Sequence, residues 1–189
     1  IALVVGCGTP YLSLFVYHLV DLTGFNLTGD VSNDLFYTII VIGANEELSK
    51  IAGVIVAFWI LRKHIKEPID YLVYAGLVAL GFSIVENYKY FNAYGLQIIT
   101  TRAFYSALVH IINTTIIVYG FYTLPLFGKG KQLTNTLIAF AISASSHGLF
   151  DFFLMNNFMG PYTHIFSIVV YLVGINFWGQ MLNNANNYS

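Results

Sequence analysis

Charged residues are scarce in this chain of 189 residues: Asp, Glu, Lys and Arg together make up 9% of it. An ordinary globular domain contains about 25% of these residues. Hydrophobic residues account for 57% of the chain, a composition typical of integral membrane proteins. The formal net charge is −1, without the positive excess of a nucleic-acid-binding protein, so we expect no nucleic-acid partner.

Cysteine and several familiar motifs are missing or nearly so. The single cysteine, Cys7, can form neither an internal disulfide nor a thiolate metal cage. The absence of His-Glu-x-x-His, Gly-x-Gly-Asp and Gly-x-Ser-Gly argues against three familiar kinds of intramembrane protease, and no P-loop or dinucleotide fingerprint occurs. Because the chain begins with Ile1 rather than Met, we expect further N-terminal sequence to precede it.

Six apolar segments, separated by polar residues, Pro or Gly, run along the chain. Each is long enough to cross the hydrocarbon, which takes about 20 helical residues. The segments are 2–20, 35–62, 69–93, 98–124, 132–155 and 161–183. We therefore predict an all-α polytopic membrane bundle of about six transmembrane helices, forming one domain over residues 1–189 of a multi-pass cell-membrane protein. The 35–62 segment is long, so we expect it to tilt, extend past the bilayer or break near Gly43.

Basic residues lie in alternate loops of this predicted bundle. The loops that follow 35–62 and 98–124 contain Arg62, Lys63, Lys66, Lys129 and Lys131. The opposite loops contain Asp21, Asp30 and Asp34 and no Lys or Arg, although Lys89 and Arg102 lie near helix ends on that side. The positive-inside rule therefore predicts that both termini lie in the cytoplasm.

Four of the predicted spans carry ionisable side chains at similar depths. A charge near the bilayer centre costs ~3 kcal/mol or more, so such residues usually serve a function. At 1.5 Å per residue, Glu46 lies ~17 Å, Glu86 ~11 Å, His110 ~18 Å and His147 ~11 Å from the outer ends of their helices. This agreement in depth predicts one polar cluster in the outer half of the membrane.

The first constellation consists of Glu46, Glu47 and Lys50. Lys50 follows Glu46 by four residues and Glu47 by three, so either acid can pair with it on one helix face. A neutral ion pair that locks two helices together is the structural alternative. One lysine neutralises only one acid, however, so the other acid is left to accept a proton or bind a metal.

Glu86 and Asn87 place a carboxylate and an amide side by side on the next span. Such residues also serve as hydrogen-bonding glue between membrane helices, so this pair alone does not specify a reaction.

Two histidines lie within the following spans. His147 and Asp151 are an i, i+4 pair on one helical face, and a carboxylate in this position can hold the tautomer of a metal-binding or catalytic histidine. His110 lies below Arg102, whose fixed positive charge would stabilise an oxyanion. The structural alternative for His110 is a hydrogen-bonded packing residue.

Four motifs occur in order on successive spans. They are Glu46-Glu47-x-x-Lys50, Phe82-x-x-x-Glu86-Asn87, Arg102 with His110 eight residues later, and His147-x-x-x-Asp151. In this order the chain resembles the PrsW family of intramembrane proteases, which is related to the type II CAAX prenyl proteases, where a His stands at the position of Glu86. The resemblance implies cleavage of membrane-anchored proteins, including anti-sigma factors, at extracytoplasmic sites. It also implies a metalloprotease, although the related prenyl proteases have been argued to work without a metal.

We expect these residues to hydrolyse a peptide bond with an activated water molecule. In a zinc version, Glu86, His110 and His147 bind the metal, and Glu46 or Glu47 takes the proton of the water. In a metal-free version, Glu46 is the base and the two histidines supply electrophilic contacts. The residues expected to assist either version are Lys50, Arg102, Asn87 and Asp151.

Two readings from other functional classes compete with a protease. Buried Glu, Lys, His and Asp would also suit a proton- or ion-coupled transporter, but the chain has no inverted repeat and its polar groups stop in the outer half. A non-catalytic scaffold would use the same cluster only to hold helices together. Substitution of Glu46 and Glu47 by Gln separates these readings, because only a protease has cleavage activity to lose.

Overall fold

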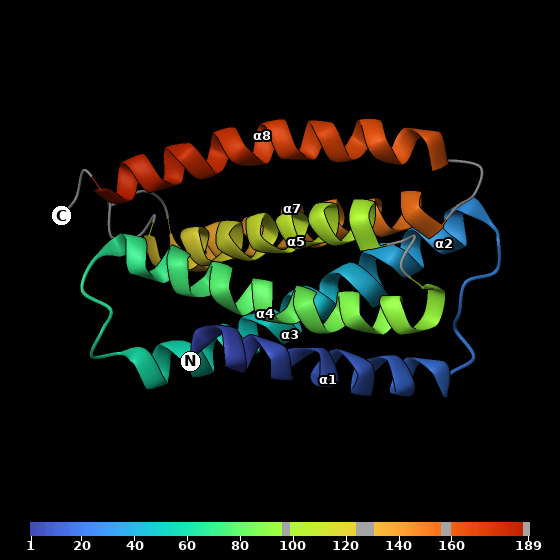
Figure 1. Ribbon diagram of the computed structural model, residues 1–189, viewed down its shortest axis with the longest axis horizontal. Helices are drawn as coiled ribbons and strands as arrows, with labels where there is room; N and C mark the ends of the chain where they lie inside the picture. The colour runs from blue at the N-terminus through green and yellow to red at the C-terminus, as the bar shows by residue number, and fades with distance from the viewer. Residues whose placement is uncertain (96–98, 124–130, 156–159, 187–189) are drawn as a thin grey trace.

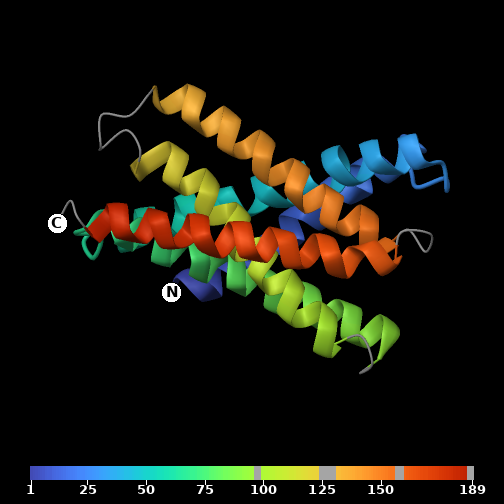
Figure 2. The same cartoon turned by 90° about the horizontal axis from the view of Figure 1, so that it is seen from above.

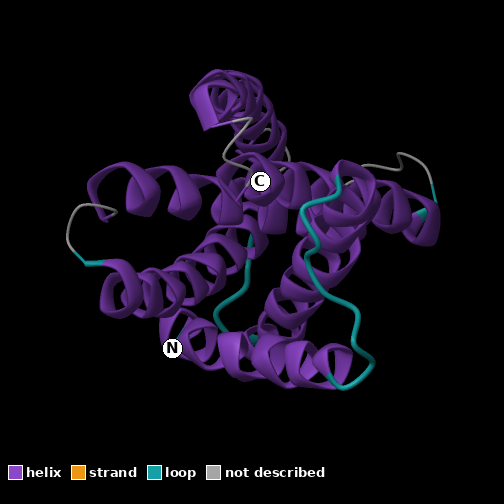
Figure 3. Cartoon of the chain, turned by 90° about the vertical axis from the view of Figure 1, so that its right-hand side faces the viewer, coloured by secondary structure: helices purple, strands orange, loops and turns teal. Residues whose placement is uncertain are grey.

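The computed structural model describes residues 1–95, 99–123, 131–155 and 160–186, and all regular elements in these ranges are helices (Figure 3). The elements are α1 (Ala2–Asp21), α2 (Val31–Tyr37), the π-helix η1 (Thr38–Ala44), α3 (Asn45–Leu61), α4 (Pro68–Tyr94), α5 (Ile99–Val118), the π-helix η3 (Tyr119–Thr123), α7 (Gln132–Met155) and α8 (Gly160–Asn186). The predicted all-α membrane bundle is thus confirmed.

Successive helical passes run in opposite directions (Figure 1). The N-terminus, the 62–67 turn and the end of α8 lie toward the left of that view, whereas the 22–30 loop and the start of α8 lie at the right. Seen from above, α8 crosses α5 and α7, against which it packs (Figure 2). The passes formed by α1, α3, α4, α5 and α7 therefore surround a shared interior, and α8 covers one side of it.

Five helical segments are long and apolar enough to cross a membrane within the described ranges, which identifies a multi-pass membrane protein. They are Ala2–Asp21, Pro68–Ala93, Tyr105–Tyr122, Gln132–Met155 and His164–Asn184. The predicted 35–62 span is not among them, because this stretch is divided between α2, η1 and α3 and contains buried charged residues. The division into six spans therefore stays a prediction.

Local sequence signals explain where two of these passes begin. Asp30 is the N-cap of α2, where its carboxylate accepts a hydrogen bond from the backbone N–H of Asn33 at 2.9 Å. α4 begins with Pro68 after Glu67, and Asp70 accepts the backbone N–H of Glu67 at 3.0 Å in a capping box. The exposed loop before α2 is held by Asp34, whose pKa is lowered by the backbone N–H of Thr28.

A close approach between η1 and α7 positions the interior polar residues. A Cβ atom on Gly43 would lie 2.3 Å from the carbonyl oxygen of Ala144, and one on Gly148 would lie 2.4 Å from Cα of Ile39. Only glycine at these two positions lets the two backbones touch, as small residues do between membrane helices. Because His147 precedes Gly148 and α3 follows η1 directly, this contact brings the α7 histidine against the start of α3.

Candidate active site

Most of the predicted polar residues meet inside the bundle. Side chains from the start of α3 and from the second halves of α4, α5 and α7 converge there, and Glu47 and Lys50 are 0% exposed. A buried charge is tolerated only when it is paired or hydrogen-bonded, so the contacts of each group define what it can do. The structure arranges these groups as one connected network.

Glu47 is the centre of this network. Its Oε1 accepts hydrogen bonds from Lys50 Nζ at 2.6 Å and from His147 Nδ1 at 2.9 Å. Its Oε2 accepts the hydroxyl of Thr114 at 3.2 Å. Both oxygens of Glu47 are therefore occupied by hydrogen bonds from neighbouring side chains.

His147 directs its second nitrogen at two acids. With Nδ1–H donated to Glu47, Nε2 faces Glu46 Oε2 at 3.4 Å and Asp151 Oδ2 at 3.3 Å. A nitrogen lone pair and two carboxylate oxygens repel one another unless a proton or a metal cation lies among them. The geometry therefore creates a position that favours positive charge.

A second chain of contacts joins Lys50 to α4 through His110. Lys50 Nζ lies 2.9 Å from His110 Nδ1, and His110 Nε2 lies 2.7 Å from Glu86 Oε2. The ring of Phe82 covers the ammonium group, with its centroid 5.0 Å from Nζ. An ammonium group can only donate, so Nδ1 accepts and the Nε2 proton points at Glu86.

Glu46 differs from its neighbour Glu47 because one of its oxygens has no hydrogen bond. Oε1 accepts the hydroxyl of Tyr17 at 2.8 Å, whereas Oε2, although buried, receives no hydrogen bond from the described residues. Glu46 and Glu86 both line a cavity of 290 Å³ between α1, η1, α3, α4 and the end of α7. Glu46 thus borders a space that a substrate could enter.

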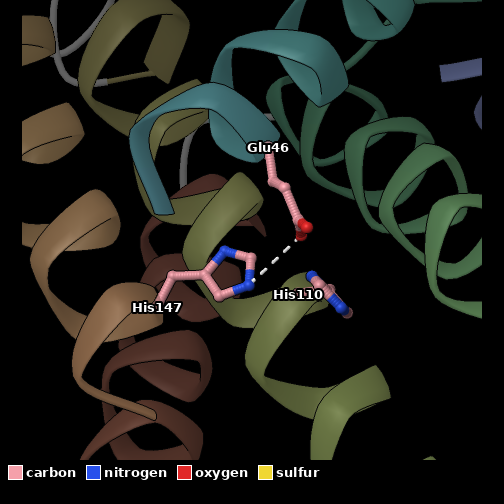
Figure 4. Close-up of side chains that lie close together, drawn as sticks. All are labelled: Glu46, His110 and His147. Carbon is pink, nitrogen blue, oxygen red and sulfur yellow. Dashed lines mark ion pairs between the residues drawn. The ribbon is translucent and has the colours of Figure 1, made fainter. Parts of the chain in front are cut away.

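Two imidazoles and a carboxylate also come within the range of a single metal ion. Glu46, His110 and His147 each offer a ligand atom within 4.8 Å of the other two (Figure 4). Two histidines with one carboxylate are a donor set of catalytic zinc sites. The composition of the group, together with a buried Glu46 Oε2 that accepts no hydrogen bond from the described residues, fits a bound divalent metal.

The structure brings together seven of the nine predicted site residues. They are Glu46, Glu47, Lys50, Glu86, His110, His147 and Asp151. Asn87 instead donates its amide to Ser83 Oγ at 3.0 Å on its own helix. Arg102 belongs to α5, but its side chain lies outside the described residues.

Two contributors were not predicted. Thr114 lies four residues after His110, so the i, i+4 spacing on α5 could have indicated it. Tyr17 comes from α1, outside the motif-bearing helices, and an isolated tyrosine in a membrane span carries no such signal. The site therefore draws on one helix more than the motifs indicate.

Comparison with known proteins shows which family the chain matches. Residues 1–176 match the family described as PrsW family intramembrane metalloprotease. The chain is 28% identical over 184 residues to Protease PrsW of Clostridioides difficile (strain 630), a match that covers 94% of this chain and 75% of that relative. It is 32% identical over 94 residues to Protease PrsW of Geobacillus kaustophilus (strain HTA426), covering 47% of this chain and 39% of that relative. No solved structure matches the chain.

Proposed function

Because the chain belongs to the PrsW family of intramembrane metalloproteases, we propose that it hydrolyses a peptide bond of membrane-anchored proteins with a water activated by Glu46. The family assignment confirms the resemblance found in the sequence motifs. The observation that carries the proposal is that Glu46 borders the cavity while its Oε2 accepts no hydrogen bond from the described residues. A base must reach the proton that it removes, and among the described residues this cavity is lined by Glu46 and not by Glu47.

Glu46 and Glu47 have separate tasks in this proposal. Glu46 Oε2 takes a proton from the attacking water, and the protonated carboxyl then delivers it to the leaving amine nitrogen. Glu47 keeps Nδ1 of His147 occupied, so that Nε2 faces the reacting groups. Lys50 neutralises Glu47 and holds the ring of His110.

His110 and His147 would hold a zinc ion in this site together with one carboxylate. The sequence predicts Glu86 as that ligand, and Glu86 lies 2.7 Å from His110 Nε2, whereas Glu46 is the acid grouped within 4.8 Å of both histidine ligand atoms. We propose Glu86 as the ligand, which leaves Glu46 as the base. Zinc supplies a Lewis acid that polarises the scissile carbonyl and acidifies water. The described hydrogen bonds of Lys50 and Asn87 go to other protein groups, among them Glu47 and Ser83. Arg102 therefore stays the residue that we predict to donate to the oxyanion.

One observation favours a metal-free version of the same protease. Since the Lys50 ammonium donates to His110 Nδ1, the proton of the neutral ring lies on Nε2 and is donated to Glu86. In this tautomer His110 is a hydrogen-bond donor rather than a metal ligand. His110 would then stabilise the developing charge of the substrate, and Glu46 would keep its role as base.

Metal analysis separates the two versions. We expect the purified protein to contain zinc, to lose cleavage of a membrane-anchored reporter in a chelator, and to regain it with added zinc. His147→Ala is expected to lose the zinc, whereas His18→Ala, an exposed histidine on α1, keeps it. Full activity in chelator with no bound metal would establish the metal-free version.

The substrates and their site of cleavage follow from the membrane setting. A protease of this family with apolar spanning helices acts on membrane-embedded proteins. The basic loops support an orientation with cytoplasmic termini, which places the cluster in the outer half of the bilayer. A single-pass protein cut near its outer end, such as an anti-sigma factor, is the substrate class we propose.

A further inference from the structure

Helix α1 brings two polar side chains to the start of α3. Asn45 Nδ2 donates to the carbonyl oxygen of Ser13 at 3.2 Å and to its hydroxyl at 3.1 Å. One turn further along α1, the Tyr17 hydroxyl donates to Glu46 Oε1 at 2.8 Å. Ser13 and Tyr17 are an i, i+4 pair, so one face of α1 holds the two consecutive residues Asn45 and Glu46.

The position of α1 is fixed by backbone contacts nearer its N-terminus. A Cβ on Gly6 would lie 2.1 Å from the carbonyl oxygen of Val78 on α4, and one on Gly53 of α3 would lie 2.3 Å from Cγ2 of Thr9. Such close packing allows α1 little freedom to slide against α3 or α4. The Tyr17 hydroxyl is therefore delivered to a defined place beside Glu46.

Tyr17 also borders the cavity that contains Glu46 and Glu86. Its hydroxyl occupies one oxygen of Glu46 and leaves the other, Oε2, directed at His147 Nε2 at 3.4 Å. A carboxylate without this bond could turn about its last torsion, which is broad for a side chain of this kind. The hydrogen bond thus distinguishes two oxygens that are otherwise chemically equivalent.

We propose that Tyr17 is a positioning residue for peptide hydrolysis, which selects Glu46 Oε2 as the atom that receives the proton of the water. The inference rests on the proposed function, because it takes Glu46 as the base. The proton moves from water to Oε2 and then to the leaving nitrogen, while Tyr17 keeps its own proton and its bond to Oε1 throughout. Tyr17 acts only through Glu46, so its effect must disappear when Glu46 is no longer a base.

Tyr17→Phe removes the hydroxyl and keeps the ring. We expect kcat for reporter cleavage to fall about 10- to 100-fold, since a small misplacement of a reacting group has an effect of this size. KM is expected to stay within about twofold, and zinc content to stay unchanged, because the loss concerns the transition state rather than binding. Tyr11→Phe, which removes an exposed phenol from the same helix, is the matched control and should leave kcat unchanged.

Three further measurements separate positioning from a structural role. In a Glu46→Gln background, Tyr17→Phe is expected to cause no additional loss of the residual activity. The infrared difference spectrum between wild type and Tyr17→Phe should contain a shifted carboxylate band, which is absent for Tyr11→Phe and in the Glu46→Gln background. Thr9→Ser removes the Cγ2 methyl group that packs against Gly53 and loosens the contact between α1 and α3 away from the cavity, so it should lower thermal stability and leave kcat unchanged.

An unchanged kcat in Tyr17→Phe would overturn the inference. An equal fall in kcat for Thr9→Ser, or a loss that adds to that of Glu46→Gln, would also overturn it by showing a structural or independent role. Retention of activity in Glu46→Gln itself is a different outcome, because it would contradict the proposed function from which this inference starts.

Discussion

Glu46→Gln is expected to reduce kcat for peptide cleavage about 10³-fold, within the ~10²–10⁴ range of general-base catalysis. The substitution keeps the shape of the side chain and its acceptor toward the Tyr17 hydroxyl, but an amide cannot take a proton from water. Since His110, His147 and Glu86 are proposed to hold zinc, the metal content should match that of the wild type. Initial rates with a membrane-anchored reporter, together with elemental analysis of the same sample, provide the measurement.

The control for this substitution is Asp21→Asn, which removes an exposed carboxylate at the end of α1. It should leave the rate unchanged. If Glu46→Gln lost both zinc and activity, Glu46 would be a metal ligand and not the base, as its position within 4.8 Å of both histidine ligand atoms also allows. Wild-type activity in a folded Glu46→Gln protein would contradict both roles.

Glu47→Gln is expected to destabilise the protein by about 3–5 kcal/mol, because it leaves the Lys50 ammonium buried without its counter-charge. The Lys50–Glu47 distance of 2.6 Å and the complete burial of both side chains leave no water to replace the lost partner. His147 Nδ1 would at the same time lose the acceptor that orients it. Equilibrium unfolding in mixed detergent measures the change.

The companion variants show whether charge pairing is the cause. Glu47→Gln combined with Lys50→Met removes both charges and should recover a large part of the lost stability. Glu46→Gln leaves the ion pair between Lys50 and Glu47 intact, so this variant should be about as stable as the wild type. If Glu47→Gln unfolded at the same denaturant concentration as the wild type, the pair would contribute nothing to the fold.

The sequence predicts the helical membrane fold because long apolar runs in a bilayer have few other structures available. It also predicts that His147 and Asp151 lie together, since residues at i and i+4 share a helical face. What it could not predict is the different surroundings of Glu46 and Glu47, from which we propose their separate roles. Neighbouring residues on a helix point about 100° apart, so the packing of other helices decides which one borders the cavity.

The packing of the helices also explains why some features of the site were not predicted from the sequence. Asn87 was expected to assist catalysis beside Glu86, yet its amide is turned to Ser83, one helical turn earlier. Tyr17 gave no signal because the chain contains 14 tyrosines and nothing in the local pattern distinguishes this one. The π-helix over Thr38–Ala44 was not predicted, because a periodicity of 3.6 residues per turn describes an α-helix and not a π-helix. The break predicted near Gly43 falls within this π-helix.

The proposed activation of water by Glu46, with cleavage of membrane-anchored proteins in the outer half of the bilayer, can be followed in cells. It is tested most directly by mass spectrometry of protein N-termini in membranes of cells that produce equal amounts of the wild type or Glu46→Gln. We predict new N-termini at or just inside the outer ends of transmembrane segments in the wild-type sample, and their absence with Glu46→Gln. Identical sets of N-termini in the two samples would show that Glu46 is not the base of such a cleavage.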